Sequence, residues 1–254
     1  MSGKNRQKMQ DRSLKQKQET GRVIKDKFKE ERKPNPPKAL TEKQEVYFDF
    51  LRNKNCIVAE GVMGSGKSYC SAVIAADMFM SGEISKIIVA RPYVQTGKTS
   101  GLKPGTTLEK LYPYVRNVLD TIRVRMGDGR YYNALKDGLT GQIEVQDIES
   151  IRGRSFDEPS FLIIEEAQQT SPEEMEAIVT RVSDNCRLVI SGCDSQRDIK
   201  GVSGLRWFKD FCIRHELQDD VGMVNFDSPE DIVRGGFVKR IAYGLAKDNG
   251  NTSF

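Results

Sequence analysis

The sequence has few of the residues that build zinc sites and histidine-based catalytic centres. Its 254 residues include one histidine, His215, and five cysteines, with no Cys-x-x-Cys pair among them. With so few candidate ligands, we expect neither a zinc site nor a Ser-His-Asp triad. The cysteines are odd in number and mostly lie in apolar surroundings, which indicates small core residues and not a disulfide framework.

Long apolar runs are also missing. A membrane-spanning helix requires about 18 consecutive apolar residues, and no stretch of the chain provides them. The N-terminus lacks the apolar core of a signal peptide, and no internal repeat is present. We therefore expect a cytoplasmic protein that has no membrane partner.

The positive charge is concentrated at the N-terminus. The net charge is +4, but residues 1–33 alone hold twelve Lys and Arg against five Asp and Glu. Residues 1–38 end in PNPP and contain too few apolar residues to offset the entropy of ordering, so we expect a disordered arm or a marginal solvated helix. Two interpretations stay open, a nucleic-acid-binding arm and a solubilising tail. The remaining residues, 39–254, are expected to form one domain.

Within residues 39–254, apolar strands alternate with helical patterns. Expected strands are 55–61, 86–92, 142–146, 161–166, 186–192 and 222–227; expected helices are 40–51, 67–82, 107–126, 131–138, 171–183, 204–211 and 231–245. The strands are continuously apolar, which predicts an α/β fold with a mainly parallel sheet covered by helices on both faces. Thr41 is the expected N-cap of the first helix, and Pro113 is expected near a kink or a helix start. Ligands of such sheets bind beyond the carboxyl ends of the strands.

A phosphate-binding motif follows the first of these strands. The stretch GVMGSGKS, residues 61–68, fits G-x-x-x-x-G-K-[ST], whose glycines let backbone N–H groups point at phosphate oxygens. Lys67 is expected to reach the β- and γ-phosphates, and Ser68 to place its hydroxyl on Mg²⁺. The alternative is a glycine-rich turn without a ligand. The expected nucleotide-binding set is Gly61, Val62, Met63, Gly64, Ser65, Gly66, Lys67, Ser68 and Tyr69.

Two further polar clusters follow apolar strands. In FLIIEEAQQ, residues 161–169, we expect Glu165 to hold the metal and Glu166 to accept a proton from the attacking water. In GCDSQRD, residues 192–198, Gln196 is the expected contact of the γ-phosphate or of that water. The alternatives are two solvated glutamates and a polar turn.

Together these motifs resemble the PhoH-like (phosphate-starvation-inducible) P-loop ATPases, which are similar to the ATPase core of superfamily-one helicases. The resemblance covers about residues 40–245 and implies a RecA-like P-loop fold. Less generic stretches support it, in the right order: ARPYVQTGKTSGLKPG, EKLYPYVRNVLD, SIRGRSF, GCDSQRDI, VSGL and DIVRGGFVKRI. Divergent copies of this family are common in phages, so a phage-encoded member acting in the host cytoplasm is one expectation.

The resemblance assigns roles where residues match. Glu166 takes the position of the catalytic base, and Glu165 replaces the family's usual aspartate. In the family's Gly-Asp-x-x-Gln turn, Gln196 is kept, but Asp194 has slipped by one position, which leaves its role open.

The resemblance also points to residues outside these motifs. Gln44 looks like the helicase-type glutamine that reads adenine. Among the arginines in family-like stretches, Arg234 is the first choice for a γ-phosphate finger, supplied in cis or by a neighbouring subunit, and Arg154 is the second. A surface salt bridge is the alternative for either arginine.

The resulting functional expectation is an ATPase that uses ATP and Mg²⁺. Its turnover would be coupled to binding, translocation or remodelling of single-stranded nucleic acid, RNA more than DNA, without cleavage. One ATPase domain implies a site closed between subunits, and the resemblance favours a homo-hexamer. The alternative is an ATP-dependent assembly or switch module without significant turnover. A small-molecule kinase is disfavoured by EEAQQ and GCDSQ.

Overall fold

The structure is a computed structural model that describes residues 34–93 and 105–248. Most of the expected basic arm, residues 1–33, lies outside the described residues. The same holds for residues 94–104, which make up most of the stretch ARPYVQTGKTSGLKPG. The compact unit that carries the fold begins at Pro37.

The described strands form one sheet in which every neighbouring pair is parallel. Its six strands are ordered β3-β2-β4-β5-β1-β6. Their bounds are β1 Cys56–Gly61, β2 Lys86–Arg91, β3 Ile143–Asp147, β4 Ser160–Ile164, β5 Cys186–Gly192 and β6 Val221–Phe226. The predicted α/β class, the parallel sheet and all six predicted strands are confirmed.

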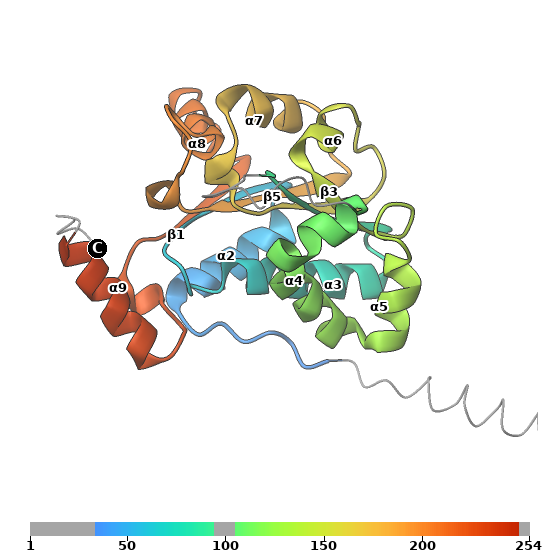
Figure 1. Ribbon diagram of the computed structural model, residues 1–254, viewed down its shortest axis with the longest axis horizontal. Coiled ribbons are helices and arrows are strands. Elements are labelled where there is room, and N and C mark those ends of the chain that lie inside the picture. Colours follow the sequence, from blue (N-terminus) through green and yellow to red (C-terminus); the bar gives the residue numbers. More distant parts are fainter. Residues whose placement is uncertain (1–33, 94–104, 249–254) are drawn as a thin grey trace, which may run out of the picture. The chain divides into compact units, whose positions relative to one another are not determined.

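Helices cover both faces of this sheet (Figure 1). One face carries α2 Glu42–Asn53, α3 Lys67–Ser81, α4 Thr107–Met126 and α5 Asp128–Leu135; the other carries α6 Ile148–Arg152, α7 Pro172–Val179 and α8 Gly204–Arg214. The last helix, α9 Gly236–Asp248, follows the short 3-10 turn η3 Pro229–Asp231. The chain thus folds into three layers, with the sheet between two layers of helices.

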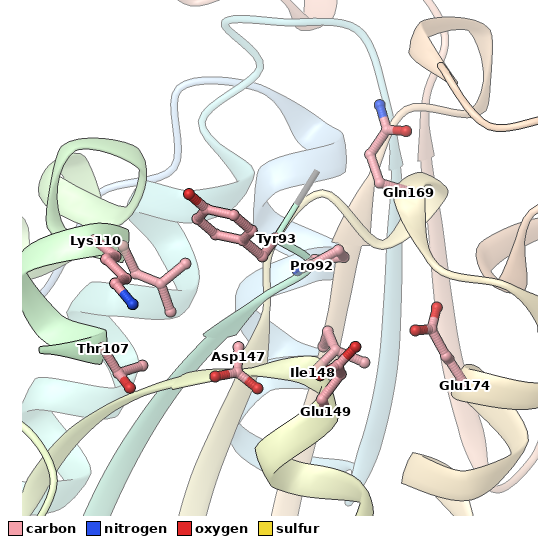
Figure 2. A pocket seen from close by; sticks show the side chains of 10 residues that line it. Pro92, Tyr93, Thr107, Lys110, Asp147, Ile148, Glu149, Gln169 and Glu174 are labelled. Atoms are coloured by element: carbon pink, nitrogen blue, oxygen red, sulfur yellow. The ribbon is translucent and has the colours of Figure 1, made fainter. Parts of the chain in front are cut away.

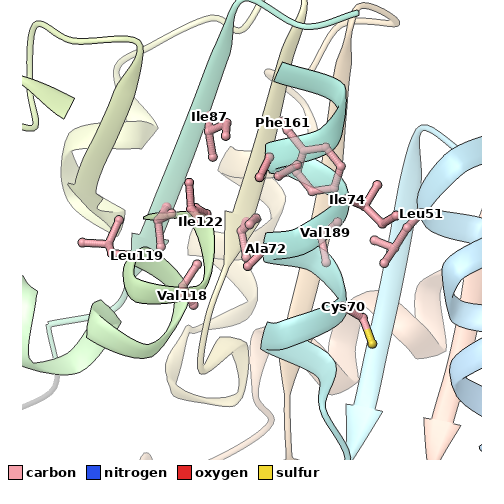
Figure 3. Packing of buried hydrophobic residues seen from close by; sticks show 14 of the residues in the cluster. Leu51, Cys70, Ala72, Ile74, Ile87, Val118, Leu119, Ile122, Phe161 and Val189 are labelled. Carbon is pink, nitrogen blue, oxygen red and sulfur yellow. The ribbon is translucent and has the colours of Figure 1, made fainter. Parts of the chain in front are cut away.

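Side chains of successive strand residues enter opposite layers of the core. In β4, Phe161 and Ile163 join the cluster under α3 and α4, whereas Leu162 and Ile164 join the cluster under α7 and α8. Figure 3 shows the first cluster, where Phe161 and Val189 lie in the layer formed by α2, α3 and α4. Because both faces are buried, the strands need continuous apolar residues.

The cysteine prediction is also confirmed by the packing. All five cysteines lie in the described residues, all are free thiols, and Cys56 alone is not fully buried. Burial raises the pKa of the Cys56 and Cys70 thiols to about 12. They therefore act as small apolar core residues and not as thiolates.

The helices differ from the sequence-based prediction mainly in their limits, which shift by a few residues in several of them. The limits of α4 are those predicted, but Pro113 lies inside the helix, after a capping box formed by Thr106 and Glu109, and therefore does not start it; a kink at Pro113 stays a prediction. The short helix α6, capped by Asp147, had no counterpart in the prediction. The last helix begins at Gly236 and not at residue 231, because the preceding backbone is bonded to the phosphate loop: the Val233 N–H donates to the Gly64 carbonyl over 3.0 Å.

Candidate nucleotide-binding site

The phosphate loop leaves β1 through backbone conformations that favour glycine. Gly61, Gly64 and Gly66 have φ values of 134°, 82° and 85°. A Cβ at Gly61 would lie 2.1 Å from the carbonyl oxygen of Phe226 in the neighbouring strand. The loop therefore needs glycine for close approach to β6 as well as for its left-handed turns.

Lys67 opens α3 and turns its ammonium group into the loop. Its Nζ donates to the carbonyl oxygens of Gly61 over 2.7 Å and of Val62 over 3.0 Å. Burial lowers the pKa of Lys67, and the carboxylates of Glu165 and Glu166 counteract this effect. A bound phosphate would satisfy the same ammonium group with a full negative charge, which is a stronger partner than backbone carbonyls.

Ser68 connects the loop to the acidic end of β4. Its hydroxyl donates to Glu165 Oε2 over 2.7 Å. The other oxygen, Glu165 Oε1, is buried and has no hydrogen-bond partner. Burial raises the pKa of Glu165, although the Ser68 hydrogen bond and the charges of Lys67 and Arg91 oppose this.

The Ser68 hydroxyl and the unpartnered Glu165 oxygen fit Mg²⁺ as oxygen ligands. The ion prefers oxygen ligands and usually binds one or two protein groups together with waters and substrate phosphates. The described residues contain no group of three or more His, Cys, Asp or Glu that could hold a metal without a nucleotide. An unpartnered carboxylate oxygen beside a serine hydroxyl is the part of such a site that the protein itself supplies.

Glu166 leaves the line of β4 in a left-handed conformation. Its φ of 55° is uncommon for a non-glycine residue, and the chain turns there from β4 into the 3-10 turn that follows. Gln168 Nε2 donates to Glu166 Oε2 over 2.6 Å, and Arg91 Nη1 lies 3.9 Å from Oε1. The carboxylate is therefore both accessible, with 38% of its side chain exposed, and held in place.

Arg91 is a site residue to which the sequence did not assign a specific role. It ends β2, its guanidinium stacks on the Tyr114 ring at 5.0 Å, and it lines the same cavity as the phosphate loop. The available signal was its position at the carboxyl end of a predicted strand.

The turn after β5, η2 Asp194–Gln196, brings Gln196 to this cavity. Asp194 instead accepts a hydrogen bond from Ser203 and lies near Arg197 and Arg206. Cys193 lines the cavity at this point. The one-residue slip noted in the sequence therefore turns the aspartate toward α8.

Two more predicted residues reach the phosphate loop from distant parts of the chain. The stem of Arg234 covers Gly64, so that a Cβ at Gly64 would lie 3.1 Å from Arg234 Cδ. Gln44 is buried, with Nε2 donating to the Ser65 carbonyl over 2.8 Å and Oε1 accepting from the Leu40 N–H over 2.8 Å. Its side chain therefore supports the loop directly, and its contact with adenine stays a prediction.

One cavity of about 440 Å³ lies at the carboxyl edge of the sheet, and Gln44 supports its phosphate loop from outside. Its walls include the loop, both glutamates, Arg91, Gln196 and Arg234. Half-exposed Tyr69 also lines it.

Arg154 is a predicted residue that lies far from this cavity in its own chain. It donates to Glu144 and lies 3.5 Å from Glu158, at the amino edge of the sheet. The proposed nucleotide contact is therefore wrong for a phosphate bound in the same chain, because the guanidinium is held at the opposite end of the strands.

A second cavity, of about 360 Å³, lies beside the first and was not predicted from the sequence. Figure 2 shows Tyr93 and Lys110 on one side of it and Gln169 and Glu174 on the other. Three carboxylates and one lysine line it, so its charge does not favour phosphate. Both cavities are lined by residues of α4, and Arg91 at the end of β2 lines the nucleotide cavity while Pro92, directly after the strand, lines the second one.

A parallel α/β sheet that carries a glycine loop, a lysine and serine at the start of a helix, and an acidic strand end defines a P-loop NTPase domain. The model of the PhoH-like protein family matches residues 37–245. The chain belongs to the PhoH-like protein family, as its motifs indicated.

Individual proteins agree with this assignment. The chain is 33% identical over 220 residues to the protein PhoH of Escherichia coli K12, covering 86% of this chain and 60% of that protein. It is 32% identical over 208 residues to a PhoH-like protein of Bacillus subtilis, covering 81% and 63%. The chain therefore spans about three fifths of the length of these relatives.

Solved structures share the fold at low sequence identity. The large terminase of a thermophilic bacteriophage matches with a TM-score of 0.52 and 13% identity, over 81% of this chain and 50% of that one. This likeness supports the fold alone. No helix in the described part of the chain is long and apolar enough to cross a bilayer.

Proposed function

We propose that this protein hydrolyses ATP with Mg²⁺ and couples the hydrolysis to binding or remodelling of single-stranded nucleic acid. The observation that carries the ATPase proposal is the pairing of Ser68 with Glu165, which leaves one buried carboxylate oxygen open beside the phosphate loop. A glycine-rich turn without a ligand would not need a desolvated carboxylate without a second partner.

The residues around the cavity have distinct roles in this proposal. The loop amides and Lys67 bind the phosphates, while Ser68 and Glu165 hold Mg²⁺, which offsets phosphate charge. Glu166, held by Gln168, accepts the proton of the attacking water, and Gln196 contacts that water or the γ-phosphate. Arg91 and Arg234 supply positive charge opposite the loop.

Arg234 is proposed to act within its own chain. Its stem packs on Gly64, the neighbouring Val233 is hydrogen-bonded to the loop, and Arg234 lines the cavity, which supports a contact with a phosphate bound by the same loop. A ring that closes the site between subunits remains part of the proposal, with a homo-hexamer as the expected assembly. The mass in solution, measured with and without ATP, tests this assembly.

The nucleic-acid part rests on the basic segment 1–33 and on the family resemblance. RNA is the proposed substrate in preference to DNA. Deletion of residues 1–38 is expected to weaken RNA binding and to reduce its salt dependence, because fewer counterions are released. An unchanged affinity and salt slope would refute a role for the arm in RNA binding.

Turnover distinguishes this proposal from the alternative, an ATP-dependent switch without hydrolysis. Phosphate release should be measured with and without single-stranded RNA or DNA for the wild type and for Glu166→Gln, together with ATP affinity. The wild type is expected to release phosphate, faster with RNA, and Glu166→Gln to bind ATP normally but to lose activity by a factor of about 10²–10⁴. A wild type that binds ATP without releasing phosphate would establish the switch instead.

A further inference from the structure

The two glutamines at the end of EEAQQ connect the β4 tip to the turn after β5. They lie in the 3-10 turn η1 Ala167–Gln169, directly after Glu166. Gln168 is 1% exposed and Gln169 is 9% exposed, so neither is a solvated surface residue. Buried amides of this size require partners, and both find them in the segment 193–198.

The Gln169 side chain makes three hydrogen bonds, all to this segment. Its Nε2 donates to the Gln196 carbonyl oxygen and to Asp198 Oδ2, each over 3.0 Å. Its Oε1 accepts from the Asp198 N–H over 3.1 Å. The side chain thus holds the backbone on both sides of Arg197.

Gln168 makes the corresponding connection closer to the cavity. Its Nε2 donates to Glu166 Oε2 over 2.6 Å, and its Oε1 accepts from the Cys193 N–H over 3.1 Å. A Cβ at Gly192 would lie 2.5 Å from this Oε1, which explains the glycine at the end of β5. One glutamine therefore fixes the carboxylate of Glu166 and the other fixes the backbone of Gln196.

The other contacts of the segment held by Gln169 lie mainly in its first half, residues 193–195. Ser195, Gln196, Arg197 and Asp198 are all exposed in a short turn beyond the sheet. At its start, Asp194 is bonded to Ser203. The Gln196 N–H donates to the Cys193 carbonyl oxygen within the turn, but among the described side chains only Gln169 bonds to the Gln196 carbonyl and to Asp198. Without Gln169, the part of the turn from Gln196 to Asp198 would lose its side-chain contacts with the connection that carries Glu166.

We propose that Gln169 is a positioning residue for ATP hydrolysis, which sets the place of Gln196 relative to Glu166 without touching the nucleotide. This inference rests on the proposed function. Gln169 lines the second cavity and not the nucleotide cavity, so a direct contact with ATP is not its role. Misplacement by about 1 Å can lower a rate by about 10²-fold.

The first test is Gln169→Ala, with Gln218→Ala as a matched control, since Gln218 is exposed in the connection between α8 and β6. Gln169→Ala is expected to lower kcat by about 10- to 100-fold while KM and ATP affinity stay within about twofold. Amide hydrogen exchange in residues 193–198 should become faster. The control should change none of these values.

The double variant Gln169→Ala/Gln196→Ala tests whether Gln169 acts through Gln196. Its kcat is expected to equal that of Gln196→Ala alone. Once the Gln196 side chain is absent, the loss of Gln169 can no longer displace it. Independent, multiplicative losses would overturn the proposal.

The variant Gln169→Glu adds a second measurement, the pH dependence of activity, which should not change if Gln169 has only a structural role. The new carboxylate keeps an acceptor for the Asp198 N–H but loses the donor, and it faces the Asp198 carboxylate and the Gln196 carbonyl. Other charged groups at this cavity are Asp147, Glu149, Glu174 and Lys110. Protonation of the new carboxyl group restores a hydrogen-bond donor to the Gln196 carbonyl and Asp198. The activity of Gln169→Glu relative to wild type should therefore rise as the pH falls from about 8 to about 6.

The outcomes separate the two proposals. A wild type without turnover overturns the proposed function and this inference with it. An active wild type with an unchanged kcat in Gln169→Ala overturns only the inference. A loss of ATP affinity equal to the loss of kcat, or a flat relative pH profile for Gln169→Glu, would also overturn it, since it would indicate a general structural defect.

Discussion

Two buried carboxylates lie at opposite edges of the same sheet and have opposite surroundings. At the amino edge, Glu144 of β3 lies 2.9 Å from Lys86 Nζ and accepts a hydrogen bond from Arg154, and Glu158 shares both cations. Burial by itself would raise the pKa of Glu144, but the hydrogen bonds from Arg154 and Lys86 outweigh it and hold this pKa below its usual value.

At the carboxyl edge, Glu165 has one hydrogen-bond partner, Ser68, and one buried oxygen without any. Its pKa is raised by burial. The contrast shows how the fold uses buried charge. A buried carboxylate whose oxygens are both paired, such as Glu144, stabilises the protein. A buried carboxylate with an unpaired oxygen, such as Glu165, lowers the stability of the fold, and a bound ligand can offset this loss.

The largest expected effect separates the two carboxylates by function. Glu165→Gln removes the charge beside the phosphate loop and should lower kcat by at least about 10²-fold. It should also abolish the dependence of nucleotide affinity on Mg²⁺. The free energy of unfolding should not fall, because a poorly solvated charge is removed. Phosphate release, nucleotide titration with and without Mg²⁺, and urea unfolding measure these quantities; a loss of stability would contradict the comparison.

Substitutions of two arginines test whether the carboxyl edge serves hydrolysis and the amino edge serves stability. Arg234→Ala should lower kcat by about 10- to 100-fold with little change in stability, because it removes positive charge from the cavity. Arg154→Ala should leave kcat per folded molecule unchanged and lower the melting temperature, because Glu144 loses a partner. Steady-state kinetics and thermal unfolding on both variants measure this. An inactive but stable Arg154→Ala would restore a role for this residue in hydrolysis.

Glu144→Gln is expected to act on stability alone. It leaves Lys86 and Arg154 with Glu158 as their remaining acidic partner and should lower the free energy of unfolding by about 2 kcal/mol. Turnover at a temperature where the variant is folded should match the wild type. Urea denaturation followed by kinetics on the same samples tests both parts, and a reduced kcat would show that the two edges are coupled.

The contribution of Glu144 should disappear in acid. Because its folded pKa lies below the ordinary value of 4.5, its stabilisation is complete above that pH and is lost as the pH falls through the folded pKa. The difference in unfolding free energy between wild type and Glu144→Gln should therefore be constant from about pH 7 to about 5 and shrink below 4.5. A difference that grows in acid would contradict the assignment.

The smallest expected effect is that of Glu165→Asp. Aspartate keeps the charge and shortens the side chain by one methylene, a change that the waters around Mg²⁺ can accommodate. Activity should fall by no more than about tenfold. An inactive variant would show that hydrolysis requires the longer glutamate side chain and its distance to Ser68.

Much of the site could be predicted because its signals are local. The phosphate loop is a contiguous motif, Glu165 and Glu166 directly follow an apolar strand, and Gln196 lies in the short turn after another. Parallel strands bring such positions to one edge whatever their order in the sheet. Arg154 was predicted wrongly for its own chain, since its family-like stretch, SIRGRSF, does not show at which edge the side chain lies.

The amino acids by themselves determined the α/β class, the six strands, the phosphate loop and the family, because periodicity and glycine placement act over a few residues. Tertiary structure decided which distant groups meet: Glu144 with Lys86 and Arg154, Arg234 with Gly64, and Gln169 with Gln196 and Asp198. These contacts depend on strand order and on the lengths of the connections. Neither is encoded in any short stretch of sequence, so the same residue types became a stabilising charge cluster at one edge and an open site at the other.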